Sequence, residues 1–254
     1  VIAGQGTIGL EVLEQLPDVD AVVVPIGGGG LISGVAYTIK QLNPKIKVIG
    51  VEPKNAASMT EALKNDGPVT LPSANTIADG TAVKRVGTKI FPYCKENIAQ
   101  MLTVDDSRLI GAFLNMVDNH KMIVENSGLL PVAALDQLDL KGKKAVLVLS
   151  GGNMDVITMS SVVQHGLIQQ DRIFTVSVLL PDKAGELVKV AAAIADQNGN
   201  VIKLEHNQFV SINRNASVEL RITMESYGTN HKQQILKALE EKGYQPKVVD
   251  TKLY

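Results

Sequence analysis

Short, unbroken apolar runs alternate with segments of helical periodicity between residues 21 and 166. A strand that is apolar on both faces must be covered on both faces, and helices that cross between parallel strands supply that cover. The alternation therefore predicts an α/β fold with a partial doubly wound parallel sheet. The predicted strands are 21–26, 47–51 and 145–150, and the predicted helices are 31–42, 56–65 and 154–165.

The stretch from Gly67 to Asp105 does not follow this alternation. It contains Pro68, Pro72 and Pro92 and shows little periodicity. Long segments without a regular pattern inside a compact domain often form functional loops. We therefore predict irregular structure here, lining a site.

The pattern changes after Gln170. The predicted elements are a strand at 173–180, a turn at 181–185, a helix at 186–197, strands at 201–207 and 216–225, a helix at 232–242 and a strand at 246–253. This βαββαβ order is that of a ferredoxin-like α+β domain. With a boundary near 169–172, the chain is predicted to hold two domains, 1–168 and 172–254.

Charge and cysteine content exclude several classes of protein. The 25 basic and 26 acidic side chains give a net charge of −1, and no basic stripe is interleaved with aromatic residues, so we expect no nucleic-acid partner. Cys94 is the single cysteine, which excludes an intrachain disulfide and fits a reducing, cytoplasmic location. The apolar runs are too short to span a bilayer, so no membrane association is expected.

The chain opens at Val1 without a methionine and continues at once into Ile-Ala-Gly-Gln-Gly-Thr. That opening is typical of the middle of a fold. We therefore interpret the chain as a fragment, which leaves open a targeting segment before it.

Four successive glycines, Gly27 to Gly30, separate the strand ending at Ile26 from the helix beginning near Leu31. Residues without a Cβ let backbone amides surround an anion, and the helix adds its positive N-terminal dipole. The turn lacks the Lys-Ser/Thr of a Walker loop and the Gly-x-Gly-x-x-Gly spacing of a dinucleotide fold. It predicts a site for the phosphate of a smaller cofactor, the alternative being a tight strand-to-helix turn.

Ser150 begins a second glycine-containing turn, Ser-Gly-Gly-Asn, at the carboxyl end of a predicted strand. Ligands bind at this edge in open α/β sheets. A hydroxyl there can form a hydrogen bond with a ring nitrogen. An ordinary turn with a capping Asn153 is the alternative.

Five short motifs, in this order, resemble the second half of the catalytic domain of threonine dehydratases. These enzymes belong to the tryptophan-synthase-β-like pyridoxal-phosphate family, together with serine racemase and serine dehydratase. The motifs are Pro25–Leu31 (PIGGGGL), Val51–Pro53 (VEP), Ala78–Val83 (ADGTAV), Glu125–Gly128 (ENSG) and Ser150–Asn153 (SGGN).

The resemblance implies pyridoxal 5′-phosphate as cofactor. It places the cofactor phosphate on the backbone amides of Gly27, Gly28, Gly29, Gly30 and Leu31. It places the Ser150 hydroxyl against the pyridine nitrogen, where a neutral group makes the ring a weaker electron sink. Gly80 and Glu125 would line the pocket, with a surface loop or helix cap as the alternative for both.

The chain departs from the family pattern at two places. The Ser-x-Lys-x-Arg-Gly motif of the Schiff-base lysine is absent from these 254 residues, and Lys84 beside Arg85 reads as a solvated charge pair. We therefore predict no catalytic lysine within the chain. Glu52 and Ala56 match metal ligands of relatives, but Ser58 replaces an aspartate, so no metal is predicted.

Residues 173–253 resemble an ACT domain, a small amino-acid-sensing module. The segment Pro181–Leu187 (PDKAGEL) matches its strand-to-helix turn. Gly185 lets the backbone approach a ligand, and the helix start favours a carboxylate. The effector residues implied are Asp182, Ala184, Gly185, Glu186 and Leu187, with isoleucine or valine as effector. A domain that serves only for dimerisation is the alternative.

The resemblance as a whole implies a threonine dehydratase of isoleucine biosynthesis. It would convert L-threonine to 2-oxobutanoate and ammonia, with side activity on L-serine, as a homodimer or homotetramer. Three alternatives are an amino-acid-binding fragment without catalysis, a relative of serine dehydratase or serine racemase, and a nucleotide-binding dehydrogenase. The absent Gly-x-Gly-x-x-Gly spacing disfavours the last.

Overall fold

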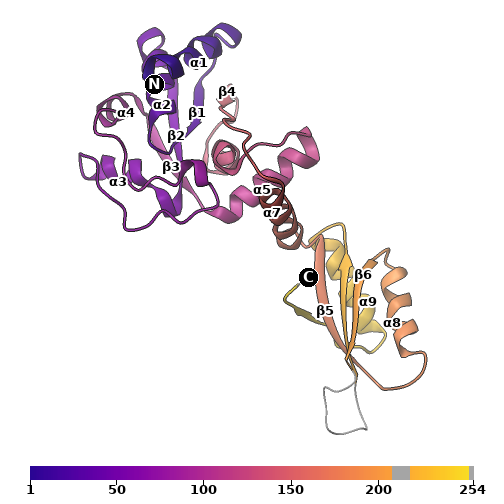
Figure 1. Cartoon of the computed structure of the whole chain (residues 1–254). Coiled ribbons are helices and arrows are strands. Elements are labelled where there is room, and N and C mark those ends of the chain that lie inside the picture. The colour runs from indigo at the N-terminus through magenta and orange to yellow at the C-terminus, as the bar shows by residue number, and fades with distance from the viewer. Residues whose placement is uncertain (208–217, 252–254) are drawn as a thin grey trace. The chain divides into compact units, whose positions relative to one another are not determined.

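The computed structural model describes residues 1–207 and 218–251 of the chain. It divides into two compact units, Val1–Val163 and Gln164–Tyr254, which are described separately (Figure 1). Within the described residues, no helix is long and apolar enough to cross a membrane.

A four-stranded parallel sheet organises the first unit. Its strands lie in the order β3-β2-β1-β4, and every neighbouring pair is parallel. The predicted parallel sheet is thus confirmed. The strands are β1 (Ala21–Pro25), β2 (Lys47–Pro53), β3 (Gln100–Val104) and β4 (Ala145–Leu147).

Helices connect these strands and cover the sheet. The α-helices are α1 (Ile2–Gln15), α2 (Gly30–Leu42), α3 (Ser58–Lys64), α4 (Phe91–Asn97), α5 (Asp106–Asn115), α6 (Leu130–Ala133) and α7 (Val156–Gln169). Short 3-10 turns lie at Lys54–Ala56, Asp79–Thr81, Asn126–Leu129 and Leu135–Gln137, and a π-helical turn lies at Met116–His120.

The side chains of β1 alternate between two hydrophobic cores. Val22 and Val24 pack with Ile39 of α2, whereas Val23 packs on the other side with Phe113 of α5 and Leu130 of α6. All five residues of β1 are buried. The continuous apolar run therefore reflects a strand covered on both faces, which is the doubly wound arrangement.

The prediction of irregular structure from Gly67 to Asp105 was wrong at its end. This stretch holds α4 and β3. Pro92 lies in the first turn of α4, where the missing N–H needs no helical partner. The ladder between β3 and β2 is a long-range contact that no local pattern announces.

The second unit has the βαββαβ order expected from the sequence. Its elements are β5 (Ile173–Leu180), α8 (Glu186–Ala195), β6 (Asn200–Asn207), β7 (Val218–Glu225), α9 (Thr229–Glu241) and β8 (Lys247–Val249). The strands form an antiparallel sheet in the order β6-β7-β5-β8. The predicted strand residues 216–217 and 252–253 lie outside the described residues.

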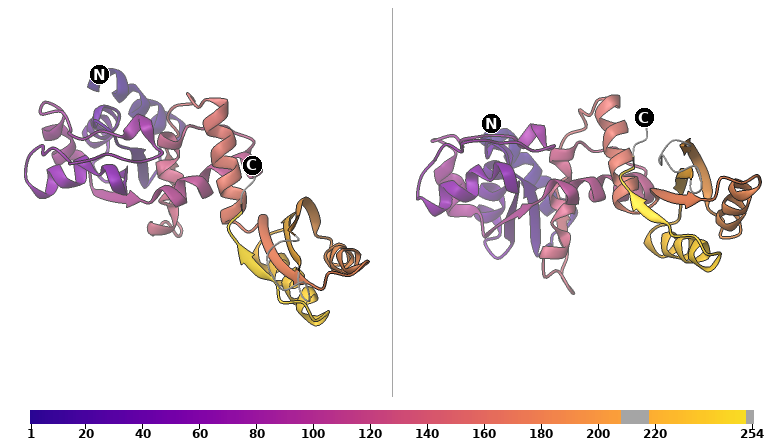
Figure 2. Two further views of the ribbon diagram at one scale, coloured as in Figure 1. Left: turned by 60° about the horizontal axis from the view of Figure 1, so that its bottom comes forward. Right: turned by 90° about the horizontal axis from the view of Figure 1, so that it is seen from below.

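One face of this second sheet carries the core. Val176 of β5 and Ile222 of β7 are buried with Ile194 of α8 and Ile235 of α9, so both helices cover the same face (Figure 2). Helix α8 is two residues shorter than predicted, and beyond it Asn198 has φ 60°, a left-handed conformation that closes the turn into β6.

Candidate cofactor site

The glycine turn after β1 is closely packed at two of its positions. Gly29 has φ +88° and caps α2, and a Cβ there would lie 2.8 Å from the Met59 and Ile90 side chains. A Cβ at Gly27 would lie 3.0 Å from the Cα of Thr81. Packing therefore leaves little space for a side chain at both positions, and the left-handed backbone of Gly29 independently favours glycine.

Gly28 is different. It is exposed, and a Cβ there would meet no protein atom within 4 Å. The amides of the first turn of α2 lack intrahelical acceptors and carry the positive end of the helix dipole. The turn thus presents open space beside backbone N–H groups, which is what a bound phosphate needs.

The second turn packs against Glu125. Gly151 has φ +87°, and a Cβ there would lie 2.2 Å from Oε1 of Glu125. The amide of Asn153 donates to Oε2 of Glu125 over 3.2 Å, and the amide of Glu125 donates to the Gly151 carbonyl over 3.3 Å. A Cβ at Gly128 would lie 2.0 Å from the Ser150 carbonyl oxygen. The segments around Glu125 and Ser150 are therefore in direct contact.

The segment around Gly80 lies between the two glycine turns. Its 3-10 turn approaches Gly27 on one side, through Gly80 and Thr81. On the other side, a Cβ at Gly80 would lie 3.2 Å from Oε1 of Glu125 and 3.0 Å from Oγ of Ser127. The motifs around Gly27, Gly80, Glu125 and Ser150 thus form one continuous surface beyond the carboxyl ends of β1 and β4.

A cavity of about 460 Å³ with both polar and apolar lining adjoins this surface and is lined in part by Glu125 and Asn153. Asn126 also lines it and was not singled out by the sequence analysis. Its amide nitrogen donates to the Ile77 carbonyl over 3.0 Å, while its Oδ1 is buried without a partner among the described residues. Asn126 and Ser127 directly follow Glu125 in the ENSG motif. Their place in that motif was a sequence signal that could have identified them as site residues.

Glu52 caps α3. Its carboxylate is fully buried and accepts hydrogen bonds from the Met59 amide (2.7 Å) and from the amide and hydroxyl of Thr60 (2.9 and 2.7 Å). Burial raises the pKa of Glu52 to about 6, and these hydrogen bonds oppose the rise. The Met59 side chain also packs beside Gly29. By binding the Met59 amide, the Glu52 carboxylate therefore helps to hold a residue that contacts the glycine turn.

The three positions compared with metal ligands form no open site. Glu52 is committed to α3, Ala56 is buried, and the Ser58 hydroxyl is buried without a partner in the described part of the chain. Among residues 1–207 and 218–251, no three His, Cys, Asp or Glu side chains are grouped to hold a metal ion. Lys84 is exposed.

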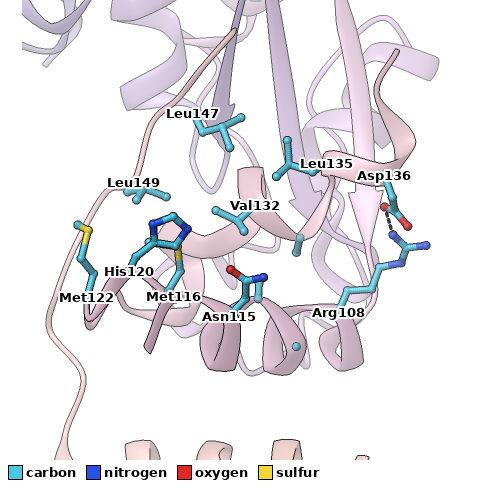
Figure 3. A pocket seen from close by; sticks show the side chains of 13 residues that line it. Arg108, Asn115, Met116, His120, Met122, Val132, Leu135, Asp136, Leu147 and Leu149 are labelled. Carbon is cyan, nitrogen blue, oxygen red and sulfur yellow. Dashed lines mark hydrogen bonds and ion pairs between the residues drawn. The ribbon is translucent and has the colours of Figure 1, made fainter. Parts of the chain in front are cut away.

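A separate cavity of about 780 Å³ lies against α5 and α6 (Figure 3). Most of its lining is apolar and includes Leu147 and Leu149. Arg108 and Asp136 also line it and form an ion pair with each other. None of the predicted site residues lines it. The cofactor is therefore better matched by the glycine-rich surface than by this apolar hollow.

The turn before α8 contains a glycine in the left-handed conformation. Gly185 has φ +91° and caps α8, and a Cβ there would meet nothing within 4 Å. Asp182, Ala184 and Leu187 are exposed. Glu186 accepts a hydrogen bond from Lys189 (2.7 Å), which lowers the pKa of Glu186.

A doubly wound parallel sheet with glycine turns at its carboxyl edge defines an α/β protein that binds its ligand at that edge. Residues 1–151 match the family model described as pyridoxal-phosphate dependent enzyme. The chain belongs to this family, and its cofactor is pyridoxal phosphate.

Comparison with individual relatives supports this family membership. The chain is 38% identical over 250 residues to the L-threonine ammonia-lyase of Thermotoga maritima, covering 98% of this chain and 62% of that protein. It is 39% identical over 247 residues to the enzyme of the same name from Geobacter sulfurreducens, covering 96% and 61%. The chain thus spans about three-fifths of the length of these relatives.

A solved structure gives the same result. The processed form of threonine deaminase isoform 2 from Solanum lycopersicum superposes with a TM-score of 0.61 at 41% sequence identity. The match covers 64% of this chain and 49% of that one.

Proposed function

We propose that the glycine-rich surface holds pyridoxal phosphate through residues of four segments. The amides of Gly27 to Leu31 would bind the phosphate, Ser150 would meet the ring nitrogen, and Gly80 and Glu125 would flank the ring. The observation that carries this proposal is the contrast within one turn: Gly27 and Gly29 are closely packed, whereas Gly28 faces open space. A tight turn alone would not need that opening.

The residues of the chain have distinct tasks in this proposal. When bound, pyridoxal phosphate supplies an electron sink for the α-carbon of an amino acid. The glycine turn fixes the cofactor by its phosphate, and the neutral Ser150 hydroxyl leaves the ring nitrogen without a carboxylate partner. The Glu125 carboxylate is held in place by the Asn153 amide and by the packing of Gly151.

We infer that the whole protein is an L-threonine ammonia-lyase that also acts on L-serine. The names of the relatives from Thermotoga maritima and Geobacter sulfurreducens support this inference. The test assays the whole protein of which this sequence is part. It measures the formation of 2-oxobutanoate from L-threonine and of pyruvate from L-serine. We expect kcat/KM to favour threonine.

Ser150→Ala provides the matched test of the ring assignment, with the exposed Ser73→Ala as control. Loss of the hydroxyl should lower kcat about tenfold or more, because the removed contact acts on the ring during elimination. The control should keep the original kcat. Equal kcat in both variants would reject the contact between Ser150 and the ring nitrogen. A clear preference of the unchanged enzyme for another substrate would reject the inferred threonine ammonia-lyase activity.

We also propose that residues 172–254 form an ACT domain that binds isoleucine or valine at the turn of Asp182 to Leu187. The βαββαβ order, the left-handed Gly185 and the start of α8 support this proposal. Two copies of the domain would pair in a homo-oligomer. Regulation then requires that the effector bind two conformational states with different affinities.

A further inference from the structure

The turn that carries Gly80 lies in a segment with little regular structure of its own. Between α3 and α4, a stretch that the structure describes throughout, the one helical element is the 3-10 turn Asp79–Thr81. This turn nevertheless lies between the two glycine turns, close to Gly27 on one side and to Glu125 on the other. Because no longer helix or strand carries it, individual contacts must fix its position.

Asp106 supplies two of these contacts from a distant helix. Its Oδ1 accepts a hydrogen bond from the Thr76 hydroxyl over 2.5 Å, and its Oδ2 accepts one from the Ile77 amide over 3.1 Å. Hydrogen bonds to a carboxylate are stronger than those between neutral groups. Both oxygens of Asp106 thus bind the segment that leads into the Asp79–Thr81 turn.

The contacts continue from Thr76 into the turn. The Thr76 hydroxyl oxygen accepts a hydrogen bond from the Ala78 amide over 3.2 Å. The Ala78 carbonyl accepts from the amide and the hydroxyl of Thr81, over 3.0 and 2.9 Å. A chain of hydrogen bonds therefore runs from Asp106 to Thr81, whose Cα would lie 3.0 Å from a Cβ at Gly27.

Asp106 lies on a firmly packed helix. It is the first residue of α5, and Leu109 and Phe113 of this helix are fully buried in the core. A carboxylate is favoured at a helix N-terminus by the helix dipole. From the other side, the Asn126 side chain donates to the Ile77 carbonyl over 3.0 Å. The segment before the turn is therefore held between α5 and the motif that contains Glu125.

We propose that Asp106 is a positioning residue of the cofactor site. It acts at a distance, through Thr76 and Ala78, and keeps the Asp79–Thr81 turn between the glycine turn and the Glu125 segment. This inference rests on the proposed cofactor surface. It adds a residue outside the five motifs to the set on which cofactor affinity depends.

Binding of pyridoxine 5′-phosphate to the full 254-residue chain tests the proposal, since this compound lacks the aldehyde that reacts with lysines. Asp106→Asn keeps the shape of the side chain but replaces one acceptor oxygen by a donor, so one hydrogen bond is lost. We expect about tenfold weaker binding. Asp105→Asn is the matched control, because it removes the same charge from an exposed neighbour that pairs with Lys54 over 3.1 Å. It should keep the original affinity.

A second pair of variants separates positioning from a loss of stability. Thr76→Val keeps the size of the side chain, removes the hydroxyl and should also weaken binding. The double variant with Asp106→Asn should lose less than the product of the two single losses, because both changes break the same chain of hydrogen bonds. Gly142→Ala, which strains an open turn elsewhere, should lower stability without changing the affinity. Thr76→Val also keeps the test open should Asp106→Asn not fold.

Amide hydrogen exchange reports on the turn without any ligand. The amides of Ala78 and Thr81 should exchange about tenfold faster in Asp106→Asn than in Asp105→Asn. Unchanged exchange, or unchanged affinity in both Asp106→Asn and Thr76→Val, overturns the positioning role and leaves the cofactor surface standing. Equal affinity of the unchanged chain for pyridoxine 5′-phosphate and pyridoxine is a different failure, which overturns the cofactor surface and this inference with it.

Discussion

The Glu125 carboxylate occupies the space that a side chain at position 151 would need. A Cβ on Gly151 would lie 2.2 Å from Oε1 and 2.8 Å from Oε2 of Glu125. Gly151 also has φ +87°, so its backbone angle and the position of the Glu125 carboxylate both disfavour a side chain there. The contact holds the segment that begins at Ser150 against the segment that begins at Glu125.

Gly151→Ala should therefore destabilise the chain more than a left-handed backbone alone explains. Gly142 is the matched control, because its φ is +72° and a Cβ there would meet nothing within 4 Å. Gly142→Ala should cost about 1–2 kcal/mol of unfolding free energy. Gly151→Ala should cost about 1 kcal/mol more, because the Glu125 carboxylate must move aside and lose the hydrogen bond from the Asn153 amide. Equal losses in urea unfolding would contradict the contact.

Glu52 should make stability fall as the pH rises. Its pKa is raised to about 6 from 4.5, so the folded chain holds this proton more tightly than the unfolded chain does. The contribution is most favourable below pH 4.5 and declines by about 2 kcal/mol as the pH passes 6.

Comparison with Glu52→Gln isolates this contribution, since other carboxyl groups titrate in both proteins. The unfolding free energy of the unchanged chain minus that of the variant should decrease by about 2 kcal/mol between pH 4 and pH 7. A difference that stays constant, or increases, over this range would be inconsistent with the raised pKa.

The 254-residue chain should not turn over L-threonine by itself. It contains no Ser-x-Lys-x-Arg-Gly motif, and this chemistry needs a lysine in the reacting position. Release of 2-oxobutanoate in the presence of pyridoxal phosphate is the measurement. Turnover that Lys84→Ala abolishes would show that the chain carries its own catalytic lysine.

Gly185→Val should weaken effector binding at the turn before α8. A side chain there strains the left-handed backbone and obstructs the approach of a carboxylate to the start of the helix. Gly243→Val is the control, because Gly243 shares the backbone angle (φ +88°) and the open surroundings. Titration with L-isoleucine and L-valine should show a binding event lost only in Gly185→Val. If both changes weakened binding equally, backbone strain would explain the effect of Gly185→Val, and the effector site at this turn would be contradicted.

Local sequence predicted the features that arise from local causes. The apolar run of β1 required cover on both faces, and Val22 and Val23 indeed pack into different cores. β3 was missed, because its ladder with β2 joins segments about fifty residues apart. Irregular structure was predicted instead.

Much of the site also depends on distant contacts. Met59 and Ile90 close around Gly29 from two segments with no characteristic spacing, and the fit of Glu125 against Gly151 is equally non-local. The glycines themselves were visible in the sequence, but their partners were not. The motif resemblance named the right segments without giving the packing between them.

The most direct test of the cofactor surface is whether the chain recognises a phosphate at Gly28. Pyridoxine 5′-phosphate and pyridoxine lack the aldehyde, so neither reacts with surface lysines, and they differ only in the phosphate. The chain should bind the phosphate ester about tenfold more tightly or better, and Gly28→Val should remove that preference. Gly67→Val, at another glycine whose Cβ would meet nothing within 4 Å, should keep it. Equal affinity for both compounds, or an unchanged preference in Gly28→Val, would contradict the account.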